Sequence, residues 1–205
     1  MTDRLLEAAR RLHALARTGL HYCSGEYDRE RYEAIERIAA ELLADPGPGA
    51  AAARVLELWS REAGYVTPKV EVRGAVFRGA AVLLVRERAD GLWTLPGGWA
   101  DVGETPSQAV TREIEQESGI RSRAIALAAL LDTRRQGRPG LFHSWKAMFL
   151  CEMLGGEPRG SYETDAAEFF DVERLPPMSL GRSTPAQVAR LHEHWRKRPM
   201  PADFD

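Results

Sequence analysis

The sequence predicts an α/β (α+β) fold: a domain of strands and helices over residues 67–205 follows a small all-helical domain over residues 1–66. Three observations support this prediction. Apolar residues recur every three to four positions up to about residue 66, as in amphipathic helices. From Val70 they alternate or run continuously, as in strands, and Thr67 and Pro68 mark the change. A chain of 205 residues is long enough for both domains.

Three helices are expected in the N-terminal domain. We expect Gly19 to interrupt the first, Asp28 to cap the second, and the third to stop near Gly64. The segment DPGPG at residues 45–49 is a clear helix breaker. Alanine-rich faces let helices pack closely, and homodimers are the commonest oligomers, so we expect a homodimer. Packing within the domain's own core is the alternative use of the same apolar residues.

The second domain begins with strands and returns to helix at its end. Its apolar stretches fall at residues 70–77, 81–85, 92–95, 124–131, 145–153 and 166–170. Gly79 marks a turn between the first two. Near the C-terminus, Ser183 is the expected N-cap of a final helix with Pro185 in its first turn.

The composition excludes some classes of partner. The chain is 44% hydrophobic and 28% charged, with a formal net charge of −2, which gives no general attraction to duplex nucleic acid or to an anionic membrane. No apolar run is long enough to span a membrane, and the first residues lack the apolar segment of a secretory signal. Cys23 and Cys151 fit no metal or redox spacing, so we expect reduced thiols in the cytoplasm.

The stretch GGWADVGETPSQAVTREIEQESGI, residues 97–120, carries the chemistry. Thr105, with proline next and glutamine three residues on, predicts a helix start with a capping box, and Gly119 predicts its end. Glu113 and Glu117 are four residues apart and therefore share one helix face. Two carboxylates alone would usually be a solvated face, but a glycine-rich loop can bring its backbone close beside them. Mg²⁺ or Mn²⁺ prefers such a set of hard oxygen ligands.

The same stretch resembles the Nudix box. The corresponding residues of this chain are Gly98, Glu104, Arg112, Glu113, Ile114, Gln116, Glu117, Gly119 and Ile120. All match the box except Gln116, which stands where the box has glutamate, and so many fixed positions make a specific signal. The resemblance implies a Nudix-type α/β/α sandwich with a mixed sheet. It also implies a metal-dependent hydrolase, using Mg²⁺ or Mn²⁺, of nucleoside diphosphates linked to another moiety.

The resemblance further implies which residues act in catalysis. Glu113 and Glu117 would hold the metal, and the carbonyl oxygen of Gly97 would join them. Nudix enzymes often use another glutamate from a later loop, and Glu163 stands at about that spacing, as fourth ligand or general base. Asp165 is the reserve for this role.

Four residues of the box, Gly98, Glu104, Arg112 and Gly119, are expected to have a structural role, and Gln116 is the one mismatch. Glu104 and Arg112 would brace the loop and helix between Gly98 and Gly119, although the arginine could instead reach a phosphate. The amide oxygen of Gln116 can still coordinate a metal, but it carries no charge and cannot act as a base. We therefore expect a working enzyme that needs a higher metal concentration than a relative with glutamate there.

The N-terminal helices resemble those of a bacterial Nudix subgroup, through TGLHY at residues 18–22 and YDRERYE at residues 27–33. That subgroup acts on X-linked nucleoside diphosphates and includes CDP-choline pyrophosphatase, so the implied reaction converts CDP-choline to CMP and phosphocholine. ADP-ribose, another nucleotide-sugar and the 5′ end of RNA are alternative substrates. A different alternative is a nucleotide-sensing module without turnover, which Gln116 favours and the retained box glutamates oppose.

Several side chains are candidates for substrate contact. Trp99 could stack on a base, although a structural role is equally compatible with its position. One charged turn could contact phosphate or single-stranded RNA, or simply be solvated; it contains Arg134, Arg135 and Arg138. Three tyrosines of the helical domain could line a cleft: Tyr22, Tyr27 and Tyr32. The five histidines show no ligand spacing, and we assign them no role.

Overall fold

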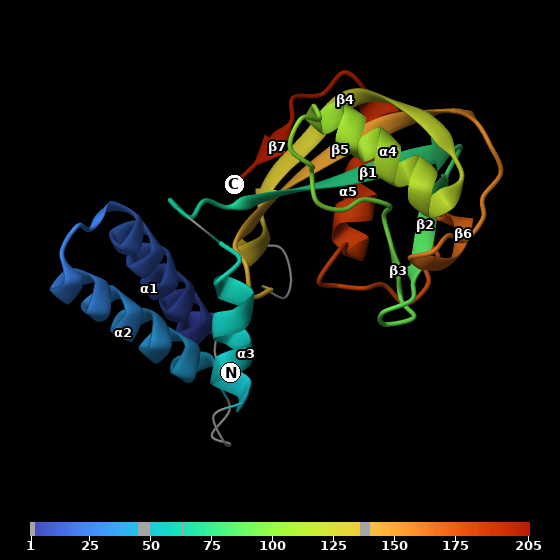
Figure 1. Ribbon diagram of the computed structural model, residues 1–205. Helices are drawn as coiled ribbons and strands as arrows, with labels where there is room; N and C mark the ends of the chain where they lie inside the picture. Colours follow the sequence, from blue (N-terminus) through green and yellow to red (C-terminus); the bar gives the residue numbers. More distant parts are fainter. Residues whose placement is uncertain (1–2, 45–49, 63, 136–139) are drawn as a thin grey trace. The chain divides into compact units, whose positions relative to one another are not determined.

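The computed structural model describes residues 3–44, 50–62, 64–135 and 140–205, and it divides into two compact units (Figure 1). The helical unit contains the chain up to Pro68 together with Leu141–His143, and the sheet unit contains Lys69–Gly140 and Ser144–Asp205. The predicted helix breaker at 45–49 and the candidate Arg138 lie outside the described residues. Among the described residues, no helix has the length and apolar character needed to cross a membrane.

The helical unit is built from three helices around a core of small side chains. They are α1 (Asp3–Tyr22), α2 (Glu26–Leu43) and α3 (Ala50–Trp59). Three buried alanines, Ala9, Ala39 and Ala40, surround Trp59. Leu141 and Phe142 pack against this core, and Arg10 donates hydrogen bonds to both of their carbonyl oxygens, at 3.0 and 3.3 Å. The helical unit thus completes its core with residues from much later in the chain.

Three predicted helix ends in this unit are wrong. α1 continues through Gly19, because the ring of Tyr32 lies against that glycine: a Cβ there would stand 2.3 Å from ring atoms. The N-cap of α2 is Gly25, and Asp28 lies in the first turn, where its negative charge favours the helix N-terminus. α3 ends at Trp59, before Gly64.

A buried histidine joins the parts of the helical unit. His13 in α1 is 3% exposed, stacks on Trp59 at 4.2 Å, and lies 2.9 Å from Glu36 and 3.1 Å from Glu62. Arg17 Nε lies 2.8 Å from the same Glu36 oxygen as an ion pair, without hydrogen-bond geometry. Burial lowers the pKa of His13, but the hydrogen bonds and charges of the two carboxylates outweigh it and raise that pKa above 6.5. The ring of His13 therefore bridges α1, α2 and the segment after α3.

The sheet unit contains one mixed sheet. Its strands are β1 (Lys69–Arg78), β2 (Ala81–Glu87), β3 (Trp93–Thr94), β4 (Arg121–Asp132), β5 (Ser144–Gly155), β6 (Thr164–Asp171) and β7 (Asp203–Phe204). The order is β3-β2-β1-β5-β4-β7, with β6 paired to β2. β1 runs parallel to β5 and β4 parallel to β7, whereas the other pairs are antiparallel. A short 3-10 helix, η1 (Thr133–Arg135), follows β4.

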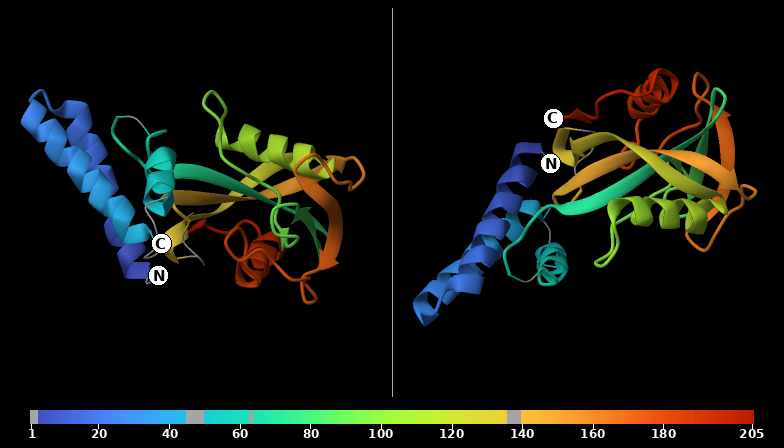
Figure 2. Two further views of the ribbon diagram at one scale, coloured as in Figure 1. Left: turned by 60° about the horizontal axis from the view of Figure 1, so that its bottom comes forward. Right: turned by 90° about the horizontal axis from the view of Figure 1, so that it is seen from above.

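One helix covers each face of this sheet, as Figure 2 shows in its right-hand view. α4 (Pro106–Ser118) packs on one face, where Val72 and Val76 of β1 meet Ile114. α5 (Pro185–Lys197) packs on the other, where Ala75 and Phe77 of β1 meet its own apolar residues. Alternate residues of one strand thus enter opposite cores, as the pleat of a strand requires. The predicted α/β/α sandwich with a mixed sheet is confirmed.

Both predicted caps of α4 are correct, whereas the predicted N-cap of α5 is wrong by one residue. α4 begins at Thr105 with the predicted capping box and ends at Gly119, whose φ of 73° is left-handed. The N-cap of α5 is Thr184 rather than Ser183, because Thr184 accepts the hydrogen bond from the amide of Gln187. Ser183 is instead buried and accepts a hydrogen bond from the hydroxyl of Thr94, 2.9 Å away.

Candidate active site

The two predicted metal-binding carboxylates lie on the inner side of α4. The caps at Thr105 and Gly119 fix the length and the phase of this helix. Glu113 and Glu117 consequently face the sheet and are 8% and 5% exposed, whereas Glu115 faces solvent. The shared face deduced from their spacing is thus present, and it is buried.

Gly97 brings backbone against Glu117. Its N–H donates a hydrogen bond to Glu117 Oε2 at 2.8 Å. The carbonyl oxygens on both sides of it, those of Pro96 and Gly98, accept hydrogen bonds from the amides of β1, so the glycine segment runs along that strand. With φ at 146°, a Cβ on Gly97 would stand 2.0 Å from the carbonyl oxygen of Val72. Only glycine fits this position without moving the strand.

Gly98 makes the matching close approach to the second carboxylate. A Cβ at Gly98 would lie 2.8 Å from Glu113 Oε1 and 3.0 Å from its carboxyl carbon. The two glycines therefore let one loop reach both carboxylates of α4. The loop backbone therefore lies close beside both carboxylates, through the N–H of Gly97 and the Cα of Gly98.

Arg112 connects the box side chains. It forms two parallel hydrogen bonds with Glu104, Nε to Oε1 at 2.7 Å and Nη2 to Oε2 at 2.9 Å, and such a bidentate pair holds its geometry well. Its Nη1 donates to Glu113 Oε1 and to Gln116 Oε1, each at 3.0 Å. One guanidinium thus orients a catalytic candidate, and the amide oxygen of Gln116 is an acceptor in the same network.

Glu163 lies in the loop before β6, which is tied to α4. The neighbouring Thr164 donates its hydroxyl hydrogen to the carbonyl oxygen of Glu117 at 2.7 Å. Glu163 itself is exposed, and its negative charge is close enough to raise the pKa of Glu113. The reserve candidate Asp165 instead pairs with Arg88, 3.0 Å away. Of the two, Glu163 is the one whose charge acts on Glu113.

The remaining candidates lie in different parts of the chain. Trp99 is 49% exposed and forms an isolated bridge with Glu71 of β1, directly after the two glycines. Arg134 and Arg135 lie in η1, and the guanidinium of Arg134 is hydrogen-bonded to Asp132 at the end of β4. Tyr22, Tyr27 and Tyr32 belong to the helical unit.

Burial and neighbouring carboxylates disfavour the ionised forms of the two α4 glutamates. Burial raises the pKa of Glu117 to about 7, the charges of Glu113 and Glu87 raise it further, and Arg73 and the Gly97 amide oppose the shift. The pKa of Glu113 is also raised, first by burial and then by Glu163, against the effect of Arg112.

The chemistry of these side chains fits a divalent cation, because Glu113 and Glu117 are hard oxygen donors close enough for the charge of one to raise the pKa of the other. Within the described residues, no three His, Cys, Asp or Glu side chains already surround one point as a metal cage would. The side chain of Glu163, being exposed, is the one that would have to turn inward to complete the donor set.

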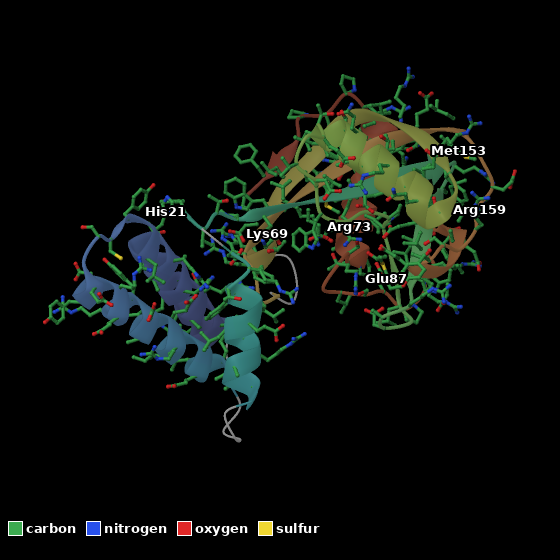
Figure 3. The ribbon with its side chains drawn as sticks, in the orientation of Figure 1. His21, Lys69, Arg73, Glu87, Met153 and Arg159 are labelled. Carbon is green, nitrogen blue, oxygen red and sulfur yellow. The ribbon has the colours of Figure 1, made fainter. Side chains whose placement is uncertain are left out.

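A buried charged network behind the site escaped the sequence analysis. Arg73, 5% exposed, donates to Glu71 at 2.6 Å and to the carbonyl oxygen of Leu95 at 2.9 Å, just before the glycine segment. Figure 3 shows Arg73 and Glu87 in the sheet unit. Lys146 is 1% exposed, and burial lowers its pKa to about 8. The available signal was two charges spaced by two in the otherwise apolar strand VEVRGAVF.

Comparison with known proteins gives two matching family models, one curated relative that matches over nearly the full length, and similar solved structures. Residues 67–192 match the NUDIX domain, and residues 3–58 match the UDP-X-like, N-terminal oligomerisation domain. The chain is 41% identical over 201 residues to YjhB of Bacillus subtilis (strain 168), which is provisionally named an ADP-ribose pyrophosphatase. That match covers 98% of this chain and 96% of the relative.

Two solved structures are similar over long stretches. The crystal structure of a UDP-X diphosphatase has a TM-score of 0.64 and 28% identity, and the match covers 100% of both chains. An ADP-ribose pyrophosphatase from Streptococcus suis 89-1591 has a TM-score of 0.63 and 38% identity, covering 68% of this chain and 100% of that one. The family predicted from residues 97–120 is confirmed.

Proposed function

The chain belongs to the Nudix hydrolases, which act on nucleoside diphosphates linked to another moiety, and we propose that it cleaves the pyrophosphate bond of CDP-choline with Mg²⁺ or Mn²⁺. One observation carries the hydrolytic assignment: Glu113 and Glu117 lie buried against Gly97 and Gly98 with their pKa values raised. A sensor module would have no need of such costly buried carboxylates.

In this proposal, some groups of the site bind the metal and another accepts a proton. Glu113, Glu117 and the Gly97 carbonyl would hold the metal, with Gln116 and Glu163 as further oxygen donors. A divalent cation there would offset the charge of the two phosphates and lower the pKa of a bound water. Arg112 fixes the carboxylate of Glu113 through its pairing with Glu104. Glu163 is exposed and would accept the proton of the attacking water.

The choice of CDP-choline rests on the helical extension and its TGLHY and YDRERYE segments. ADP-ribose is the second candidate, because the full-length relative with 41% identity is provisionally named for it. Trp99 would stack on the base in either case, and Arg134 and Arg135 would contact phosphate. An RNA 5′ end is the remaining alternative.

A substrate panel tests the proposal directly. Purified protein is incubated with CDP-choline, ADP-ribose, UDP-linked sugars and 5′-triphosphorylated RNA, with Mg²⁺, with Mn²⁺ or with a chelator, and the products are separated. We expect CMP and phosphocholine from CDP-choline, formed only with metal. Formation of AMP and ribose phosphate at a higher kcat/KM would replace CDP-choline by ADP-ribose. No turnover of any compound, together with nucleotide binding, would favour the sensor.

The proposal includes an assembly and a location. We propose that the domains divide at residues 66 and 67 and that the protein is a homodimer. The match of residues 3–58 to an oligomerisation domain supports an oligomer. A cytoplasmic location is part of the same proposal; the free thiols of Cys23 and Cys151 are compatible with it.

A further inference from the structure

The loop that enters the box is held to β1 through its carbonyl oxygens. We call residues 95–98 the LPGG segment. Two of its residues offer the strand no N–H, because Pro96 has none and Gly97 donates its own to α4. The backbone amides of Val72 and Gly74 donate instead to two of the segment's carbonyl oxygens, at 2.8 and 2.9 Å. The position of the LPGG segment therefore depends on donors that β1 supplies.

Arg73, which lies between these two amides in β1, supplies a third donor. Its buried guanidinium donates from Nη1 to the carbonyl oxygen of Leu95 at 2.9 Å. The same oxygen accepts from the hydroxyl of Thr94 at 3.3 Å, and the Leu95 amide donates to Ser183 at 3.4 Å, so both of these contacts are longer. Three consecutive residues of β1 thus hold the carbonyl oxygens of residues 95, 96 and 98, and among the three only Arg73 does so through a side chain.

A buried carboxylate fixes the guanidinium of Arg73 in this position. Its Nε donates to Glu71 Oε1 at 2.6 Å, and a hydrogen bond between charged partners of this length is strong and well oriented. The nitrogens of a guanidinium are joined rigidly in one plane, so fixing Nε also fixes Nη1. Glu71 thereby sets the place at which Arg73 holds the carbonyl oxygen of Leu95.

The position of the LPGG segment decides how its two glycines meet α4. The Gly97 amide lies 2.8 Å from Glu117 Oε2, and a Cβ on Gly98 would stand 2.8 Å from Glu113 Oε1. A small shift of the segment would therefore change its contacts with both carboxylates. The guanidinium of Arg73 also acts on Glu117 through space, because burial raises the pKa of that glutamate and the charge of Arg73 opposes the shift.

We propose that Arg73 is a positioning residue for hydrolysis: anchored on Glu71, it holds the LPGG segment where the Gly97 amide meets Glu117. This inference rests on the proposed pyrophosphate hydrolysis and adds a residue that acts through the loop, without touching substrate.

A purely structural ion pair is the alternative role for Arg73, because removing one partner of a buried ion pair destabilises a fold whether or not the pair serves catalysis. Lys146 separates the two roles. Its Nζ lies 3.8 Å from the same oxygen of Glu71, but it donates its hydrogen bond to the carbonyl oxygen of Arg182, which lies outside the LPGG segment. Lys146→Met is therefore the matched control for Arg73→Met.

The experiment compares Arg73→Met, Arg73→Lys and Lys146→Met in the full-length protein, with CDP-choline and with ADP-ribose as substrates. Both methionine variants remove a buried cation from Glu71, so both should melt below the wild type. Arg73→Met should lower kcat roughly 30-fold and change KM by less than about threefold, because a misplaced group slows the chemical step more than it weakens binding. Lys146→Met should keep kcat within about twofold of the wild type. Arg73→Lys keeps the charge but lacks the planar fork, so kcat should fall about tenfold.

A second readout does not depend on turnover. Hydrogen exchange of the Gly97 amide is followed by NMR in isotope-labelled, metal-free protein. Its exchange should be roughly tenfold faster in Arg73→Met than in the wild type, because the segment that presents this amide to Glu117 loses a contact. Lys146→Met should exchange this amide at the wild-type rate.

The possible outcomes separate this inference from the proposed hydrolysis. If Arg73→Met melts lower but keeps the wild-type kcat and Gly97 exchange, Arg73 is structural only and the inference is overturned. If Arg73→Met does not fold, Arg73→Lys decides: a wild-type kcat and exchange in that variant would show that charge alone suffices. A wild type that turns over neither substrate would overturn the hydrolysis, whereas faster Gly97 exchange in Arg73→Met would still support the hold on the LPGG segment.

Discussion

Two buried glutamates, one in each unit, differ in what surrounds them. Glu36 of the helical unit is 7% exposed and Glu117 of the sheet unit is 5% exposed, so their burial is nearly equal. Burial alone would raise the pKa of both, but the hydrogen bond from His13 and the charge of Arg17 lower that of Glu36 below 4.5. The pKa of Glu117 is instead raised to about 7. Burial by itself therefore does not reveal function; a buried charge left uncompensated does.

The largest expected effect is the loss of either α4 carboxylate. Glu117→Gln and Glu113→Gln keep the side-chain shape but remove a charge that would hold the metal, so kcat/KM should fall by roughly 100-fold or more. Glu115→Gln, an exposed position on the same helix, should leave it unchanged. Steady-state kinetics at several Mg²⁺ concentrations measure all three. Near-normal turnover of Glu117→Gln would remove that residue from the site.

The corresponding change in the helical unit should affect stability instead of chemistry. His13→Gln removes the ring that joins the buried Glu36 to the partly buried Glu62 and should lower the free energy of unfolding by about 3 kcal/mol. Thermal unfolding followed by circular dichroism measures this loss. An unchanged melting temperature would show that the bridge made by His13 contributes nothing to stability.

The pH dependence of that loss has a defined sign. The pKa of His13 is raised above 6.5, so its contribution to stability is complete below pH 6.5 and is lost as the pH rises through its folded-state pKa. The pKa of Glu36 is lowered below 4.5, so its contribution is present above pH 4.5 and is lost as the pH falls further. The difference in melting temperature between wild type and His13→Gln should therefore be greatest between these values. A difference that grows above pH 7 would contradict the assignment.

A smaller effect is expected when the loop is pushed away from α4. Gly98→Ala would place a Cβ 2.8 Å from Glu113 Oε1, so the carboxylate must shift by a few tenths of an ångström. We expect kcat/KM to fall about tenfold, with little change in melting temperature. Gly181→Ala, at an exposed glycine whose Cβ would meet nothing within 4 Å, is the control.

The smallest effect concerns the one departure from the box. Gln116→Glu adds a negative charge beside Glu113 and Arg112, so the Mg²⁺ concentration for half-maximal rate should fall about threefold. The measurement is a metal titration at saturating substrate. An unchanged titration would mean that Gln116 serves only as an acceptor for Arg112.

Local signals were predictable from the sequence, and contacts between distant residues were not. The capping box at Thr105 and the left-handed Gly119 are properties of a few consecutive residues, which is why α4 and the face of Glu117 could be deduced. Gly19 was predicted to interrupt its helix because glycine is a poor helix former. The reason for a glycine there is the ring of Tyr32, which lies on another helix and so could not be deduced from the residues around Gly19.

The same limit explains the buried charges. His13 meets carboxylates 23 and 49 residues away, at Glu36 and Glu62, and no spacing rule connects them. Arg73 donates a hydrogen bond to the carbonyl oxygen of Leu95, 22 residues later. Every residue has a backbone carbonyl, so the sequence does not indicate which one Arg73 contacts. The error at Ser183 had a different cause. Ser183 and Thr184 are both able to cap a helix, but Ser183 is buried in the folded protein, and Thr184 is the N-cap.

The hydrogen bonds from Arg10 to the carbonyl oxygens of Leu141 and Phe142 bear on the design of truncated or chimeric forms of this protein. A shortened chain that begins at residue 69 would keep these two residues but lose the helices on which they pack. An isolated N-terminal fragment would have the opposite defect, an unfilled place beside Trp59. The helical unit includes three residues, Leu141–His143, that lie within the sequence of the sheet unit. The two units should therefore be kept together when either is moved to another protein.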